Sequence, residues 1–136
     1  MYFFNMCRYS DDLLNELWEK ANPVDGYDST LVRKDPCGAW IQRDKYNDRD
    51  SDFGWEVDHV YPQALLKEKG ADLDEIDNIS NLRAFNWHNN VSKGLDYPVY
   101  HIAVKSEDDK NVLADDEFKV NKNRQEEIKR IYGKYL

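Results

Sequence analysis

Apolar residues recur every three to four positions near the start of the chain, which is the spacing of a helix that packs on a core. The recurring positions are Leu13, Leu14, Leu17, Trp18 and Ala21. Ser10 precedes them as a suitable N-cap, and Pro23 follows them as a stop signal. The pattern therefore predicts a helix from Ser10 to Asn22.

Two short strands are predicted in the middle of the chain. Residues 55–58 alternate apolar and polar positions, as a half-buried strand does, and residues 82–85 are expected to form the second strand. The first segment is followed by a predicted helix over 62–70, and the second by a helix that Asn86 caps and Gly94 ends. This mixture of short strands and helices predicts an α+β fold.

The remaining segments carry weaker signals. Loops are expected at 24–52, 72–80 and 106–117, with short strands at 39–41 and 99–104. A last helix is expected to begin near Asn123, because Asn123 and Glu126 have the spacing of a capping box. From Asn121 onward there are five basic and two acidic residues. Such a helix is more often a solvated face or an internal counter-charge than a DNA contact, and both interpretations stay open.

Composition narrows the class of protein. With 136 residues the expectation is a single domain over 1–136. No apolar run approaches the roughly 20 residues that cross a bilayer, so no membrane partner is expected. The first residues, Met1 to Phe4, lack the basic region of a secretory signal, and two cysteines are too few for a disulfide scaffold. We therefore expect a reduced, cytoplasmic protein.

Charge argues against one class of nucleic-acid binder. Nineteen basic and 27 acidic residues give a formal net charge of −8. Affinity that comes from bulk positive charge is therefore not expected. An enzyme that meets phosphate through a cation and a local basic face remains compatible with this balance.

The chemistry is concentrated between Trp55 and Gly94. Asp58 and His59 are adjacent at the end of the first predicted strand, so their side chains point to opposite sides. A carboxylate is an oxygen ligand suited to Mg²⁺, and a neutral imidazole can take a proton from water near neutral pH. Alone, an Asp-His pair is more often part of a surface turn or a hydrogen-bonded pair. Its interpretation as a catalytic pair therefore depends on the residues that follow it in the sequence.

Helix geometry sorts the second segment. At about 100° per residue, Asn86, Asn90 and Lys93 share one face of the predicted helix, while His88 lies nearly opposite Asn90. Asn90 and His88 therefore cannot serve one metal ion from the same regular helix. The Asn90 face offers an amide oxygen one turn from a lysine that could hold a phosphate.

These residues resemble the pattern of the HNH endonucleases, also called the ββα-metal or His-Me finger group. The matching positions are Asp58-His59, Asn81, Asn90 and Lys93, with nine residues from Asn81 to Asn90 and three from Asn90 to Lys93. The stretches Cys37-Gly38-Ala39 and Gly54-Trp55 are similar to a subset of the family. The resemblance implies a ββα-metal core over about 54–94, with flanking N- and C-terminal helices and short additional strands.

The resemblance also implies a reaction and a set of roles. The chain would be a metal-dependent endonuclease that hydrolyses phosphodiester bonds, in DNA rather than RNA, to a 5′ phosphate and a 3′ hydroxyl. His59 would be the general base and Asn81 would orient its imidazole. Asp58 and Asn90 would hold one Mg²⁺ or Mn²⁺ ion. Lys93, Arg83 and His88 would face the substrate, although a lysine in a last helical turn is favoured on other grounds too.

The sequence departs from the family at two points. Many members carry two CxxC pairs that bind a structural zinc, and here Asn86 and Asn89 occupy the second pair's positions, so no structural zinc is expected. The connection from His59 to Asn81 is longer than in compact members, which predicts an inserted helix over the site. Asn86 is better explained as a helix cap, and Cys37 as a small buried hydrophobe.

Two other functions remain open at this stage. One is a catalytically inactive nucleic-acid-binding module with the same fold. The other is an acidic protein-interaction module or inhibitor, because an acidic surface can mask a basic partner. The acidic balance also suggests that a partner subunit or an inhibitor could bind the chain. The endonuclease is favoured because every position that the chemistry needs is filled.

Overall fold

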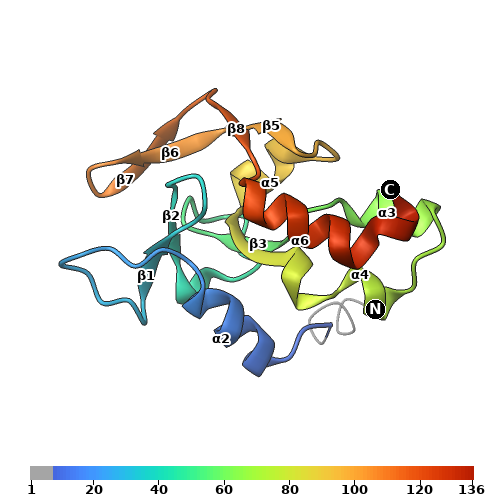
Figure 1. The fold of residues 1–136 in the computed structure, drawn as a ribbon. Helices are drawn as coiled ribbons and strands as arrows, with labels where there is room; N and C mark the ends of the chain where they lie inside the picture. Colours follow the sequence, from blue (N-terminus) through green and yellow to red (C-terminus); the bar gives the residue numbers. More distant parts are fainter. Residues whose placement is uncertain (1–7) are drawn as a thin grey trace.

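The computed structural model describes residues 8–136, so Met1 to Phe4 and Cys7 lie outside the described part. The fold mixes helices with small antiparallel strand pairs, which agrees with the predicted α+β class (Figure 1). The helices are α2 (Asp11–Glu19), α3 (Gln63–Glu68), α4 (Leu73–Ile76), α5 (Trp87–Lys93) and α6 (Lys122–Tyr132), with 3₁₀ turns at Arg43–Lys45, Ile79–Asn81 and Gly133–Tyr135. The strands are β1 (Val32–Lys34), β2 (Trp40–Gln42), β3 (Trp55–His59), β4 (Leu82–Asn86), β5 (Val99–His101), β6 (Val104–Glu107), β7 (Lys110–Leu113) and β8 (Glu117–Lys119). Within residues 8–136, no helix has both the length and the apolar character needed to cross a membrane.

The centre of the fold is the antiparallel pair of β3 and β4, followed directly by α5. The register runs from Trp55 opposite Asn86 to His59 opposite Leu82. The Asn86 side chain caps α5 by accepting a hydrogen bond from the His88 backbone, as the sequence predicts. Gly94 ends the helix with a φ of +52°. Helix α5 packs back against both strands, so residues distant in sequence meet between helix and strand pair.

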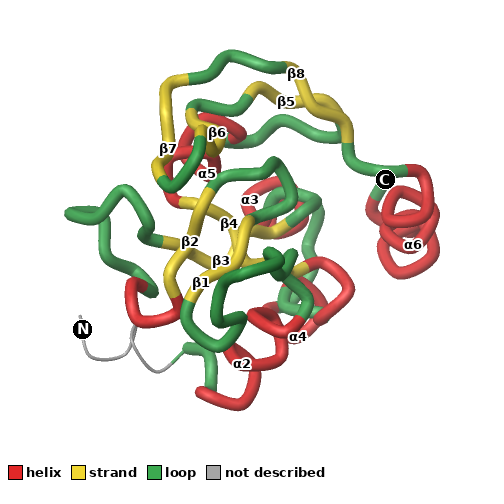
Figure 2. The backbone as a smooth tube through the Cα atoms, turned by 90° about the vertical axis from the view of Figure 1, so that its left-hand side faces the viewer, coloured by secondary structure: helices red, strands yellow, loops and turns green. Residues whose placement is uncertain are grey.

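Strand β4 separates two hydrophobic clusters. Phe85 packs into the cluster formed mainly by α3, α4, β5 and α6, and its neighbour Ala84 packs into the cluster formed mainly by α2, β2 and β3. Neighbouring strand residues point to opposite faces, so one strand serves both clusters. In Figure 2 the strands β1 to β4 lie centrally, with β5 to β8 above them and α2 and α4 below. Trp40 and Trp55 are buried, as expected for core residues.

A buried polar network holds α5 at its N-terminal end. Asp35 is fully buried and accepts hydrogen bonds from the backbone of Cys37, Ala39 and Asn86 and from the side chain of Asn89. Burial raises the pKa of Asp35, and these hydrogen bonds oppose that rise. Asn89 also binds the backbone at 103–104. The two asparagines at the positions of the second CxxC pair therefore join three chain segments by hydrogen bonds.

Three expectations about secondary structure are wrong. The segment 106–117 was expected to be a loop, but β6 and β7 pair through a tight turn at Asp108, whose φ of +54° suits an acidic turn residue. The segment 72–80 contains α4, which Asp72 and Glu75 start with a capping box. The last helix begins at Lys122 with Asn121 as its cap, instead of at Asn123. In each case a polar residue that favours loops also provides a turn or cap.

Candidate active site

The last two residues of β3 lie on opposite faces of the strand. Asp58 pairs in register with Arg83 and points to the face covered by α5, whereas His59 pairs with Leu82 and points to α4. This is the side-chain alternation that the sequence predicts for a strand. The two residues therefore lie in different surroundings, and each has its own partners.

The imidazole of His59 is held by Asp77, which follows α4. Nε2 of His59 lies 2.8 Å from Oδ1 of Asp77, and the side chain of His59 is 10% exposed. A carboxylate can only accept, so Nε2 carries the hydrogen and Nδ1 keeps its lone pair. Burial lowers the pKa of His59, and the hydrogen bond to Asp77 opposes that shift without reversing it. The ring is therefore neutral at pH 7, with one nitrogen free to accept a proton.

Asp77 is in turn bound by Arg8, which comes just before α2. Nη2 and Nε of Arg8 lie 2.9 and 3.2 Å from the two carboxylate oxygens of Asp77, and Nη2 also donates to Gln63. The guanidinium fixes the carboxylate in a two-point contact and balances its charge. Sequence reasoning missed Asp77, because a single acid in an acidic connection carries no signal of its own.

The side-chain hydrogen bonds of Asn81 go to backbone groups and not to the imidazole, so its expected role in orienting His59 would be indirect. Its side chain is fully buried, and Oδ1 accepts from the backbone N–H of Tyr61 at 2.7 Å while Nδ2 donates to the carbonyl of Tyr61 at 3.1 Å. The backbone carbonyl of Asn81 also accepts from Val60. Asn81 therefore fixes the chain directly after His59, and Asp77 makes the direct contact to the ring.

Asp58 is the anion of a buried trio of charges. Nε of Arg83 donates to its Oδ2 at 2.8 Å, and Nζ of Lys93 lies 3.4 Å from its Oδ1. The side chains of Asp58, Arg83 and Lys93 are 4%, 12% and 1% exposed. Burial lowers the pKa of Lys93, and the Asp58 carboxylate opposes this. Burial also disfavours the charge on Arg83, but the neighbouring carboxylate raises its pKa above the ordinary value.

Asn90 meets β3 through a residue that sequence reasoning missed. Its Nδ2 donates to Oε1 of Glu56 at 3.0 Å, and Glu56 is also bound at two points by Arg49. Glu56 lies two residues before Asp58 and therefore on the same face of β3. The helix face of Asn90 and Lys93 thus packs on the strand face of Glu56 and Asp58, as the helical spacing predicts. The signal that could have identified Glu56 is its i−2 relation to Asp58.

The expected pair of metal ligands does not fit a divalent ion in this arrangement. Both oxygens of Asp58 face a positively charged side chain, and a further cation there would be repelled by Arg83 and Lys93. The Asn90 amide is directed at Glu56, about two strand residues or roughly 7 Å along β3. Among residues 8–136, no group of three or more His, Cys, Asp or Glu side chains could hold an ion. Magnesium or manganese dependence stays a prediction.

Two of the three expected substrate contacts are engaged within the protein. Lys93 is buried and donates to the carbonyl of His59 at 3.1 Å, so it is not available to a phosphate, and this expectation is corrected. Arg83 uses Nε for Asp58 and Nη2 for the hydroxyl of Tyr100. His88 lies partly exposed, with its ring stacked on Trp87 at 3.7 Å. Of these three residues, only His88 has a side chain that is neither buried nor bound to Asp58.

Comparison of the chain with models of protein families, with curated proteins and with solved structures finds no match. The resemblance to the HNH endonucleases therefore rests on the motif residues alone.

Proposed function

We propose that this protein is an endonuclease that hydrolyses phosphodiester bonds in nucleic acid, with His59 as the general base. The observation that carries the proposal is the hydrogen-bonded pair of His59 and Asp77 at the end of β3. A neutral imidazole whose second nitrogen is bound to a carboxylate is an arrangement suited to accepting a proton. The order of strand, strand and helix, with Asp58-His59 and Asn90 at the motif spacing, supports the same class.

The chemistry follows from the tautomer of the ring. Nδ1 of His59 would take a proton from water as the water oxygen attacks phosphorus, and the leaving 3′ oxygen would take a proton from solvent. Asp77 would stabilise the imidazolium that forms, and Arg8 would hold that carboxylate in place. A positioned general base of this kind contributes about 10²- to 10⁴-fold to a rate.

We assign no step to a divalent ion, because Arg83 and Lys93 already contact the two carboxylate oxygens of Asp58. The dependence on Mg²⁺ or Mn²⁺ that the resemblance implies can be measured by plasmid cleavage in the presence and absence of EDTA.

A nucleic-acid-binding module without turnover is the second candidate. The observation that favours it is the closed Asp58 trio, together with an imidazole that is only 10% exposed. Binding that persists while wild type leaves the substrate intact would support this candidate.

The experiment is the nicking or linearising of supercoiled plasmid, followed with Mg²⁺, with Mn²⁺ and with EDTA. The endonuclease proposal expects relaxed or linear product from wild type and a large loss in His59→Ala. A single-stranded RNA run beside the plasmid tests the preference for DNA. Wild type that leaves every substrate intact while binding it would favour the second candidate.

A further inference from the structure

We propose that a groove between α2, β4 and the start of α6 binds the phosphodiester backbone of nucleic acid. We call it the basic groove and define its polar lining as Lys20, Asn22, Arg83, Asn121 and Arg124. This proposal rests on the proposed function, because the groove would hold the strand that the enzyme cleaves. Binding in the groove does not require cleavage, so it can be measured separately.

The side chains that line the basic groove include three cations, whereas the whole chain is acidic. The cavity measures about 290 Å³, and of the three cations Arg83 is already paired with Asp58 behind the lining. Among the described residues that line it there is no carboxylate, although the chain carries a net charge of −8. A local concentration of positive charge in an acidic protein attracts anions to that place rather than to the surface as a whole. The two asparagines beside the cations can donate hydrogen bonds to phosphate or sugar oxygens.

The basic groove lies one strand away from His59. Leu82 lines it and is the register partner of His59 across the β3–β4 pair, where paired Cα atoms lie roughly 5 Å apart. Arg124 donates to the carbonyl of Ser80, two residues before Leu82. Among residues 8–136, no strand is paired with the other edge of β4, and the groove lies along this edge. A backbone in the groove would therefore pass close to the end of β3.

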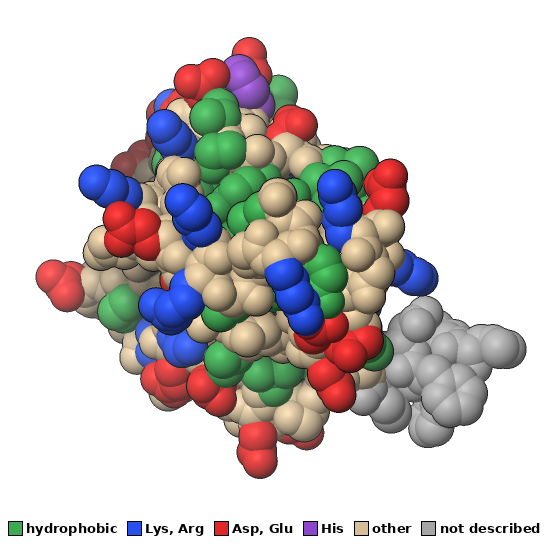
Figure 3. Space-filling model, turned by 45° about the vertical axis from the view of Figure 1, so that its right-hand side comes forward, with side chains coloured by type: hydrophobic (Ala, Val, Ile, Leu, Met, Phe, Trp, Pro, Cys, Tyr) green, Lys and Arg blue, Asp and Glu red, His purple; other side chains and the backbone are tan. Residues whose placement is uncertain are grey.

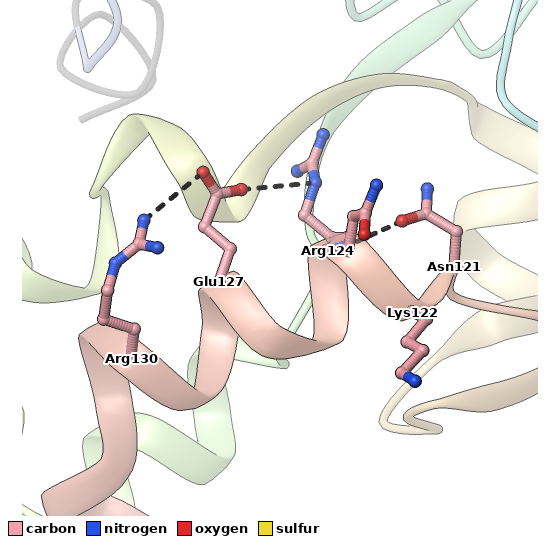
Figure 4. A pocket seen from close by; sticks show the side chains of 6 residues that line it. Asn121, Lys122, Arg124, Glu127 and Arg130 are labelled. Carbon is pink, nitrogen blue, oxygen red and sulfur yellow. Dashed lines mark hydrogen bonds and ion pairs between the residues drawn. The ribbon is translucent and has the colours of Figure 1, made fainter.

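The positive charge continues along α6. A second hollow of about 540 Å³ shares Asn121 and Arg124 with the basic groove and adds Arg130. Figure 4 shows Arg124, Glu127 and Arg130 projecting from one side of α6, while Lys122 points away from them. Arg124 and Arg130 are about 9 Å apart along the helix axis. That span corresponds to roughly two to three nucleotides at 3.4 Å each.

The ion pairs of these arginines with Glu127 are weak enough to be exchanged, and Arg124 also donates to the carbonyl of Ser80 at 2.9 Å. Glu127 lies 3.9 Å from Nε of Arg124 and 3.8 Å from Nη2 of Arg130, and exposed pairs at such distances contribute about 1 kcal/mol or less. Burial lowers the pKa of Arg124, and the neighbouring guanidinium of Arg83 lowers it further. An anion between two like charges would relieve that repulsion. Figure 3 shows Lys and Arg side chains spread across the middle of the face that it draws, with carboxylates between them.

The test measures binding of a fluorescein-labelled duplex DNA oligonucleotide by anisotropy, in the His59→Ala background and in EDTA so that the probe is not cleaved. The salt concentration is varied between about 50 and 200 mM, because each phosphate contact contributes about −0.9 to the slope of log K against log salt. Lys20→Gln with Arg124→Gln should reduce the slope by about 1.8, and Lys20→Gln alone by about half of that. Lys20→Gln changes an exposed side chain, so this arm does not depend on the contact of Arg124 with Ser80.

A matched control removes the same charge elsewhere. Lys69→Gln with Lys110→Gln changes two exposed lysines outside the groove and should leave the slope unchanged. Arg124→Lys keeps the charge and should retain most of the slope. An unchanged slope in the groove variants, or an equal loss in the control pair, would overturn the proposal. Displacement of the oligonucleotide by inorganic phosphate well beyond chloride at equal ionic strength would also overturn it, because the groove would then be a small-anion site. Wild type that fails to cleave plasmid leaves these binding outcomes untouched.

Discussion

Substitution of Asp58 by asparagine tests the buried trio of charges most sharply. The amide keeps the shape of the side chain but removes the only anion between Arg83 and Lys93. Two cationic side chains, 12% and 1% exposed, would then face each other without compensation. The folded state would have to bear their desolvation and mutual repulsion.

The expected loss is large for a single substitution. Removing one partner from a buried ion pair costs about 3–5 kcal/mol, because the remaining charge is left unpaired. For a domain of this size, that corresponds to a fall in Tm of roughly 10 °C or more. Lys93→Met is the matched control, because it leaves a one-to-one pair of Arg83 and Asp58. Its main loss is the hydrogen bond to the carbonyl of His59, about 1 kcal/mol.

The pH dependence provides a second measurement on the same variants. The pKa of Lys93 is lower in the folded chain than in the unfolded chain, and Asp58 raises it from that low value. Removing Asp58 therefore lowers the folded-state pKa further. The folded state then binds fewer protons than the unfolded state, so the stability of Asp58→Asn should rise with pH between these two values.

The assay is urea or thermal unfolding followed by circular dichroism at about pH 7 and about pH 9.5, below and near the ordinary lysine pKa. Asp58→Asn should be less stable than Lys93→Met at the lower pH, and the difference should shrink at the higher one. Equal stability of Asp58→Asn and wild type at the lower pH would refute the reasoning.

Two further predictions follow from the contacts around His59. Asp77→Asn should lower kcat about 10²-fold or more and move the acid limb of the kcat/KM profile to lower pH, because Asp77 raises the pKa of His59; an unmoved acid limb would contradict the contact. Asn81→Ala should cost about 2–4 kcal/mol of unfolding free energy, because it leaves the N–H and carbonyl of Tyr61 without partners; a loss of rate with full stability would instead restore a direct role on the imidazole.

The local structure of the motif could be predicted from the sequence because its signals are local. Alternation predicted β3, a second strand was expected at the position of β4, and Asn86 and Gly94 marked the two ends of α5. Helical spacing placed Asn90 and Lys93 on one face, and the structure packs that face on β3. These inferences need only neighbours a few residues apart.

The partners of each side chain could not be predicted in this way. Asp77 binds His59 because α4 brings it there, and that helix was expected to be a loop. Arg83 and Lys93 were expected to face substrate, but both bind the buried carboxylate of Asp58 instead. An unpaired charge in a protein interior is costly, so the nearest opposite charge determines where such a side chain points. Spacing within a motif carries no information about that competition.

The measurement that tests the central claim most directly is the initial rate of supercoiled-plasmid cleavage by wild type and by His59→Ala, with both variants shown to be folded by circular dichroism. If His59 is the general base, wild type cleaves and His59→Ala is slower by about 10²- to 10⁴-fold. Cleavage by His59→Ala at the wild-type rate would contradict the account.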